Sequence, residues 1–393
     1  MRGKKLFQGL LIIIALIIVS SNSFAAGGTL HLFMSALAIA HVQDPELKQL
    51  LINNRNVVLW ASWYPDSGYA GSNEYGEYSH WTPFLDGYID YIKNETGSGH
   101  SDYEKLVAHA LGTAAHGIQD QVFDHLFLQK TAEEDGTGQS ELDFGLDLVC
   151  MWDYGRHSLK IPDQVFVDYD KYTPVNHLTN VYNRLGMTYN NVRQQIINGQ
   201  ALLASGMLGE KTIFIFGHDA VRRQSPWGTE NYYSAPGGIA HNAEITARYW
   251  EALWKRIKNS SDDFVMGTFP KNNTKILSAV TGTVDSDISI FFNRKYKKYS
   301  INNTTFIVED NNGNRVWGSF AWCYTSNMVR FSPAQALTAP EYSVTLTSGI
   351  QDDKGAFMAN DYTFSFTTPQ CREVCYEEQV GCDTVTKCST VCE

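Results

Sequence analysis

The chain has little positive charge. Its 393 residues include 31 Lys and Arg against 42 Asp and Glu, which gives a formal net charge of −11 at pH 7. Proteins that bind nucleic-acid backbones need a basic surface, so this balance disfavours that class but permits cation binding. Internal repeats and low-complexity segments are also lacking. The 43% hydrophobic and 13% aromatic content instead predicts folded domains with sizeable cores.

Long apolar runs are lacking beyond the N-terminus. The run Leu10–Val19 is too short to span a bilayer comfortably, and no later stretch approaches about 18 apolar residues. It follows a basic segment that ends at Lys5 and precedes Ser23-Phe24-Ala25, the order of a cleavable signal peptide over residues 1–25. An uncleaved N-terminal anchor is the alternative. We therefore expect an exported protein, either secreted or held in the periplasm or at the cell surface.

Cysteine is scarce until the last stretch of the chain. Cys150 and Cys323 are isolated, whereas five of the seven cysteines fall within residues 369–393. This tail has no His and no CxxC pair, so disulfides are favoured over a metal-binding knuckle. Five cysteines predict two disulfides and one thiol that pairs elsewhere, and the sequence leaves the connectivity open.

The residue pattern changes once along the chain. Residues 27–265 read as predominantly helical, with a Pro-free stretch over 105–128 and a helix over 240–258. From near Pro270, alternating apolar and polar residues predict short strands separated by turn signals. The expected fold is multidomain: a mainly α-helical domain over 27–265, an all-β sandwich over 270–368, and the cysteine-rich tail.

The strand region resembles the bacterial Ig-like domains of secreted and surface-layer proteins. The residues that carry this resemblance are Thr304–Val308, Asp310–Gly313, Phe331-Ser332-Pro333 and Tyr362–Thr368. The resemblance implies a spacer or adhesion module that contacts the cell surface, rather than a catalytic domain.

All eleven histidines precede residue 242, so they fall in the helical region. His116 and Asp120 are four residues apart and share one helix face, and His109 and Asp124 project to the same side. Such groups are expensive to bury unless they pair with one another or bind a ligand. Zinc suits a set of imidazole nitrogens and carboxylates. A simple hydrogen-bonded His–Asp pair on the helix is the alternative.

Two motifs upstream of this helix contain further candidate ligands. Tyr64-Pro65-Asp66 begins a turn that could expose a carboxylate, and His80-Trp81-Thr82-Pro83-Phe84 follows it; His31 lies earlier still. Together with Ala115–Asp120, these motifs resemble the zinc-dependent phospholipase C/D family, most closely the catalytic domain of glycosylphosphatidylinositol-specific phospholipase D. The resemblance covers most of 29–150 and is weaker from there to residue 265.

The resemblance implies a zinc cluster. Asp66, His80, His116 and Asp120 would surround one zinc ion, and His31 would hold a second with Asp120 as the bridge. Asp66 would act both as a ligand and as the catalytic acceptor of the proton from the attacking water.

A third cation site departs from the family pattern. The family has histidines where this chain has Asp124 and Gln139, and only Asp143 matches the family's acidic ligand. A carboxamide is a poor zinc ligand beside imidazole. The third site is expected to bind weakly, to use Asp124 and Asp143 for a harder cation, or to be vacant.

These features predict an exported zinc-dependent phosphodiesterase that hydrolyses phospholipids or lipid-linked phosphodiesters at a membrane surface, using metal-activated water. Cleavage of the phospholipase C type and of the D type both remain open. One alternative is a zinc-dependent nuclease specific for single strands. The other is a non-catalytic surface-binding protein with structural metal.

Overall fold

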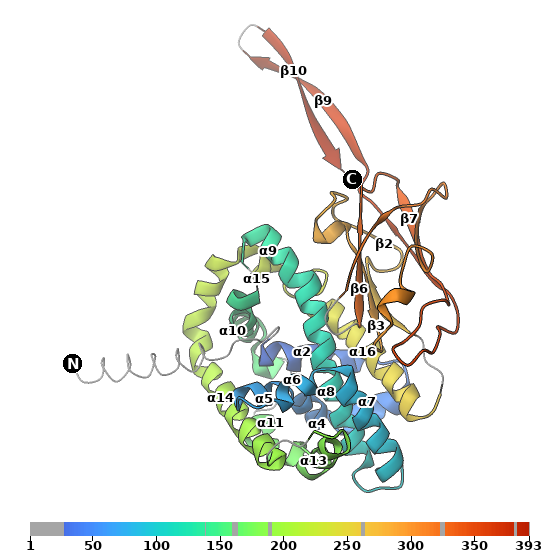
Figure 1. The fold of residues 1–393 in the computed structure, drawn as a ribbon. Coiled ribbons are helices and arrows are strands. Elements are labelled where there is room, and N and C mark those ends of the chain that lie inside the picture. Colours follow the sequence, from blue (N-terminus) through green and yellow to red (C-terminus); the bar gives the residue numbers. More distant parts are fainter. Residues whose placement is uncertain are drawn as a thin grey trace, which may run out of the picture. The chain divides into compact units, whose positions relative to one another are not determined.

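The computed structural model describes residues 27–137, 139–158, 164–187, 191–260, 264–322, 327–380 and 383–392. The predicted signal peptide (residues 1–25) lies outside the described residues. The chain divides into a helical unit, up to residue 262, and a β-rich unit from residue 263 onward (Figure 1). Among the described helices, none combines the length and the apolar character that crossing a membrane requires.

In its described residues, the helical unit consists of α-helices and the π-helical turns η1 and η2. In chain order the elements are α2 (Gly28–His41), α3 (Pro45–Asn53), α4 (Arg55–Ala61), α5 (Asp66–Ala70), α6 (Tyr75–Ser79), α7 (Thr82–Tyr91), η1 (Ile92–Thr96), α8 (Tyr103–Val122), η2 (Phe123–Leu128), α9 (Gln129–Asp135), α10 (Gln139–Ser158), α11 (Gln164–Val167), α12 (Tyr169–Tyr172), α13 (Val175–Arg184), α14 (Val192–Gln224), α15 (Pro226–Asn231) and α16 (Ile239–Ile257).

Helix α8 is the central element of this unit. It packs against α2, α4, α7 and α16, and all of its residues from Leu106 to Val122 are buried (Figure 1). A helix that is buried on every side is normally apolar all round, yet α8 carries three buried ionisable groups, His109, His116 and Asp120. The Pro-free stretch over 105–128, expected to be helical, is helical throughout, and it changes from α-helix to π-helix at Phe123.

The short helix α5 is held by the long helix α14. Gly199 of α14 lies against the backbone of Ser67, and a Cβ at this glycine would stand 2.1 Å from the Ser67 carbonyl oxygen. No other residue allows so close an approach of the two backbones. The first residue of α5, Asp66, is thereby fixed inside the unit.

The β-rich unit is a sandwich of two four-stranded sheets with strand orders β1-β3-β6-β5 and β2-β8-β7-β4. The apolar residues of the alternating strands fill its core, so the expected fold class of a helical domain followed by an all-β sandwich is confirmed. The strands are β1 (Val265–Phe269), β2 (Thr274–Lys275), β3 (Ile288–Phe292), β4 (Phe306–Asp310), β5 (Gly318–Trp322), β6 (Met328–Pro333), β7 (Glu341–Leu346) and β8 (Tyr362–Thr367).

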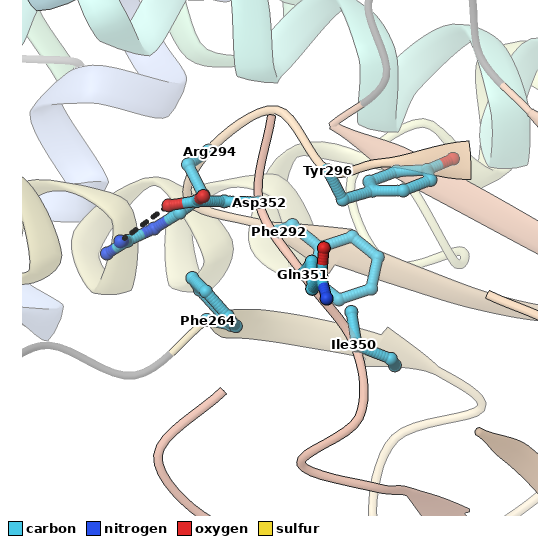
Figure 2. Close-up of a pocket in the computed structure, with 7 residues that line it drawn as sticks. All are labelled: Phe264, Phe292, Arg294, Tyr296, Ile350, Gln351 and Asp352. Atoms are coloured by element: carbon cyan, nitrogen blue, oxygen red, sulfur yellow. Dashed lines mark ion pairs between the residues drawn. The ribbon is translucent and has the colours of Figure 1, made fainter. Parts of the chain in front are cut away.

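A small pocket in the β-rich unit is lined by seven residues, among them Phe264, Arg294, Tyr296 and Asp352 (Figure 2). Its charged groups are paired with their surroundings. The Arg294 guanidinium lies 3.6 Å from a carboxylate oxygen of Asp352 and 4.5 Å from the centroid of the Phe264 ring. Asp352 also accepts the Ala356 N–H at 2.8 Å. These contacts hold the segment that contains Asp352 in place. They leave no cluster of reactive groups among the residues lining this pocket.

The chain continues after the sandwich as a two-stranded antiparallel hairpin of β9 (Cys371–Val380) and β10 (Asp383–Cys392). The sequence predicted a disulfide-linked tail here but not its secondary structure.

Candidate metal centre

Asp147 and Gln119 position His31, which lies in the first turn of α2. This helix begins without a capping side chain from its own N-terminal segment. The buried carboxylate of Asp147, from α10, instead accepts the backbone N–H groups of Thr29 at 3.0 Å and Leu30 at 2.9 Å. A carboxylate at a helix N-terminus satisfies free N–H groups and complements the helix dipole. It therefore fixes the start of α2 and, with it, His31.

The amide of Gln119 has a defined orientation. Its Nε2 donates to Ser35 Oγ at 3.0 Å, so its Oε1 accepts from His31 Nδ1 at 2.8 Å. This side chain therefore orients the His31 ring from α8.

His80 follows α6 and precedes α7, which begins at Thr82. Its backbone lies against α8 at Gly117, where a Cβ would stand 2.1 Å from the His80 carbonyl oxygen. The glycine that follows His116 in the sequence thus lets the His80 segment approach the helix that carries His116 and Asp120.

Asp66 is the first residue of α5 and only 1% exposed. The expectation that its turn would expose a carboxylate is wrong, because α14 covers α5 through Gly199. A buried carboxylate needs a charged partner or a bound cation.

Four of these groups converge around the Nε2 atom of His116. This atom lies 3.0 Å from His80 Nε2, 3.3 Å from Asp66 Oδ1 and 3.4 Å from Asp120 Oδ2. His80 Nε2 in turn lies 3.6 Å from Asp66 Oδ1 and 4.0 Å from Asp120 Oδ2. Residues from α5, the α6–α7 junction and α8 therefore surround one point.

His31 approaches the other oxygen of Asp120. His31 Nε2 lies 3.1 Å from Asp120 Oδ1, and the His31 and His116 rings stack with centroids 4.0 Å apart. Asp120 thus presents Oδ1 to His31 and Oδ2 to His116 and His80. A carboxylate with its two oxygens directed at different imidazoles is placed so that it could bridge two cations.

The three imidazoles share one orientation, with Nδ1 at hydrogen-bond distance from a carbonyl oxygen. The acceptors are Gln119 Oε1 for His31 at 2.8 Å, the Gly76 backbone oxygen for His80 at 2.6 Å and the Ser62 backbone oxygen for His116 at 2.8 Å. A carbonyl oxygen can only accept, so each Nδ1 carries a proton. A neutral ring then has its lone pair on Nε2, the atom that faces the cluster in all three cases. Histidine ligands of metals are usually held in this way.

The electrostatics divide the histidines into two kinds. Burial lowers the pKa of His31, but Asp120 outweighs burial and raises it to about 9. The pKa of His80 is also raised, because Asp66 and Asp120 outweigh burial. Burial and the neighbouring His31 lower the pKa of His116.

The two carboxylates have lowered pKa values. Burial raises the pKa of both Asp66 and Asp120, and the neighbouring histidines outweigh it. The histidines therefore favour the ionised form of both carboxylates despite burial.

The donor set fits divalent metal. His31 with His116 and Asp120 form one group, and Asp66 with His80 and His116 form another; within each, the ligand atoms lie within 4.8 Å of one another. Within the described part of the chain, His31 Nε2, Asp66 Oδ2 and Asp120 Oδ1 are buried atoms without a hydrogen bond of good geometry. Three imidazole nitrogens and two carboxylates are ligands that zinc favours.

The two remaining predicted ligands are not in these groups. Asp124 follows Asp120 by one turn but lies in the π-helical turn η2, and it belongs to neither group. Asp143 belongs to α10, and its side chain lies outside the described residues, as does that of Gln139.

His109, predicted on the same side of α8 as His116, contacts core residues and belongs to neither ligand group. Its Nδ1 is 3.4 Å from Tyr88 Oη and 3.4 Å from Thr113 Oγ1, and its ring packs against Tyr64. Burial lowers its pKa to about 3, so the ring is neutral. His109 is a core residue beneath the site.

Comparison with known proteins agrees with both parts of the chain. Residues 260–368 match the bacterial Ig-like domain family. The chain is 26% identical over 200 residues to phosphatidylinositol-glycan-specific phospholipase D of Mus musculus, which is 47% of this chain and 23% of the relative. It is 30% identical over 129 residues to the Bos taurus protein of that name, which is 30% of this chain and 15% of the relative.

Structural similarity is weaker. The crystal structure of CopC from Methylosinus trichosporium OB3b aligns with a TM-score of 0.21 and 10% identity, covering 27% of this chain and 91% of that one. This chain spans less than a quarter of the length of the two phospholipase D relatives. Its partial homology to phosphatidylinositol-glycan-specific phospholipase D, and its bacterial Ig-like domain over residues 260–368, confirm the two resemblances that the sequence motifs predicted.

Proposed function

We propose that the helical unit is a zinc-dependent phosphodiesterase that uses water to hydrolyse phospholipids or lipid-linked phosphodiesters. The observation that carries this proposal is the orientation of His31, His80 and His116. Each has Nδ1 at hydrogen-bond distance from a carbonyl oxygen. The Nε2 atoms of His80 and His116 face both Asp66 and Asp120, and that of His31 faces Asp120. The relatives that are named phospholipase D support the substrate class.

The proposal assigns two zinc ions to five side chains. Asp66, His80, His116 and Asp120 would hold the first ion, and His31 with the second oxygen of Asp120 would hold the other. Bound zinc would supply positive charge that neutralises the charge of a phosphodiester, and it would lower the pKa of a bound water to about 7. A third cation at Asp124 and Asp143 stays a prediction.

Within this proposal Asp66 is the catalytic base. The His116 and His80 imidazoles keep its carboxylate ionised despite burial, and its Oδ2 has no hydrogen bond of good geometry among the described residues. An ionised carboxylate with one free oxygen accepts a proton from the attacking water while its other oxygen remains bound in the cluster. Both oxygens of Asp120 lie close to histidine nitrogens, Oδ1 at 3.1 Å from His31 and Oδ2 at 3.4 Å from His116, so in this proposal Asp120 is a bridging ligand rather than the base.

Export completes the proposal. A signal peptide over residues 1–25 would deliver the protein to the cell surface, the periplasm or the medium, where lipid-linked phosphodiesters are accessible. The Ig-like domain would serve there as a spacer or a cell-surface contact.

A hydrolysis assay tests the proposal. The full-length protein, treated with chelator and then with zinc, is incubated with phosphatidylcholine vesicles, phosphatidylinositol vesicles and single-stranded DNA. We expect lipid hydrolysis that disappears with chelator and returns with zinc. The variant His116→Gln should abolish it, and His125→Gln, a nearby histidine outside both ligand groups, should not.

Two results would overturn the proposal. Zinc-dependent cleavage of DNA without lipid hydrolysis would identify a nuclease. Stoichiometric zinc without turnover of any of the three substrates would identify a structural metal.

A further inference from the structure

We propose that the C-terminal hairpin is closed by two cross-strand disulfides, Cys371 to Cys392 and Cys375 to Cys388. The backbone register carries this proposal. In the antiparallel pairing of β9 with β10, Cys371 stands opposite Cys392 and Cys375 stands opposite Cys388. Four of the five tail cysteines are thus placed as two directly opposed pairs.

The position of each pair in the ladder suits a disulfide. Two residues separate the paired Val380 and Asp383, and the residues that flank a two-residue hairpin loop form a hydrogen-bonded pair. Hydrogen-bonded and non-hydrogen-bonded pairs then alternate along the strands. Counted from Val380, Cys375 belongs to the sixth pair and Cys371 to the tenth, so both fall at non-hydrogen-bonded positions.

The spacing at such positions agrees with disulfide geometry. Directly opposed residues of a non-hydrogen-bonded pair have Cα atoms about 4.5 Å apart, within the range of about 4.4–6.8 Å that disulfides require. Because Cys371 and Cys375 are four residues apart on one strand, both bridges fall on the same face of the hairpin. In the crossed pairing, Cys371 would join Cys388 and Cys375 would join Cys392. Each bridge would then have to span four residues along the strand, about 13 Å, which no disulfide can do.

Such bridges would also stabilise the hairpin. A two-stranded hairpin on its own is marginally stable in water at best, and cross-links that restrict the unfolded chain are a common way to stabilise so small an element. Each bridge forms by thiol–disulfide exchange. Two cysteine thiols are oxidised to one disulfide, and the disulfide of an exported thiol–disulfide oxidoreductase is reduced to two thiols.

Counting thiols in matched variants tests the pairing. Full-length protein is isolated without reductant from an oxidising compartment, denatured with chelator and alkylated, and its modified cysteines are counted by mass spectrometry. The register-matched variant Cys371→Ser with Cys392→Ser removes one proposed bridge completely, so it should show as many free thiols as the wild type. The crossed variant Cys371→Ser with Cys388→Ser removes one partner from each bridge, so it should show two more.

Tryptic digestion provides an independent readout. Cleavage after Lys354, Arg372 and Lys387 separates the cysteines into three peptides, which the proposed bridges hold together as one species until reduction. Four alkylated tail cysteines in the wild type, or a link between Cys371 and Cys375, would overturn the proposal. Extra thiols in the register-matched variant would overturn it as well.

Discussion

The imidazole rings of His31 and His116 stack at the centre of the helical unit, with centroids 4.0 Å apart and planes inclined by 28°. Two stacked rings so close together cannot both carry a positive charge at low cost. The pKa of His31 rises to about 9 because Asp120 outweighs burial, whereas burial and His31 lower the pKa of His116. In the metal-free protein, His116 is therefore ready to bind a cation and His31 must first lose a proton.

This difference predicts that zinc binding releases protons near neutral pH. His31 contributes about one, since its pKa of about 9 keeps it protonated until metal enters. His80, whose pKa is also raised, adds to this. Calorimetric titration of metal-free protein in two buffers with different ionisation enthalpies measures the number released. The variant His31→Gln should release about one proton fewer, and a binding heat that does not depend on the buffer would contradict the prediction.

The role of Asp66 as proton acceptor predicts a separation of turnover from metal content. Asp66→Asn keeps an oxygen for the cluster but removes the base, so hydrolysis should fall by about 10²-fold or more while bound zinc falls much less. Turnover and zinc content are measured on the same preparations. Proportional losses of both would show that Asp66 is a ligand alone.

Gln119 is predicted to act as a positioning residue for His31. Gln119→Met removes the acceptor for His31 Nδ1, and loss of such a partner typically weakens metal binding by about 10–100-fold. Only the affinity for the zinc ion at His31 should fall, and not that for the other ion. Both affinities are measured by competition with a chromophoric chelator. Gln121→Met, a buried glutamine on the same helix that belongs to neither ligand group, is the matched control. Equal effects of the two variants would show a general packing defect.

His109 predicts how stability depends on pH. Burial lowers its pKa in the folded protein to about 3, against about 6.5 for the exposed group. Between these two pH values the unfolded chain binds a proton at His109 that the folded protein does not bind. The contribution of the neutral His109 ring to stability is therefore full above a pH of about 6.5 and is lost as the pH falls toward about 3. In the presence of chelator, His109→Gln should flatten the loss of unfolding free energy in this range. An unchanged pH profile would mean that His109 is not buried as a neutral ring.

Sequence patterns could predict the candidate ligands but not the groups that orient them. His31, Asp66, His80, His116 and Asp120 lie in motifs whose residue types suit zinc, and the structure brings all five together. Two of the three acceptors for the histidines are backbone carbonyls, those of Ser62 and Gly76, which have no signature in a sequence. Asp147 could not be predicted either, because its contact with Thr29 and Leu30 joins segments 118 and 117 residues apart.

Tertiary structure changes local geometry at places that a helical projection treats as regular. Projection onto one α-helix places Asp124 and His109 on the side of His116. The helix becomes π-helical at Phe123, which changes the angular position of Asp124, and the ring of His109 contacts Tyr88, Thr113 and Tyr64. The role of Asp124 as a ligand stays a prediction. The exposed turn expected at Asp66 is covered by α14, an arrangement that depends on Gly199, about 130 residues later in the sequence.

The most direct test of the central claim is anomalous diffraction at the zinc edge from crystals of the zinc-loaded protein. We predict a peak about 2.0–2.1 Å from the Nε2 atoms of His80 and His116, and a second peak between His31 Nε2 and Asp120 Oδ1. Zinc found only at other places, such as the tail cysteines, or no peak among these five side chains, would contradict the account.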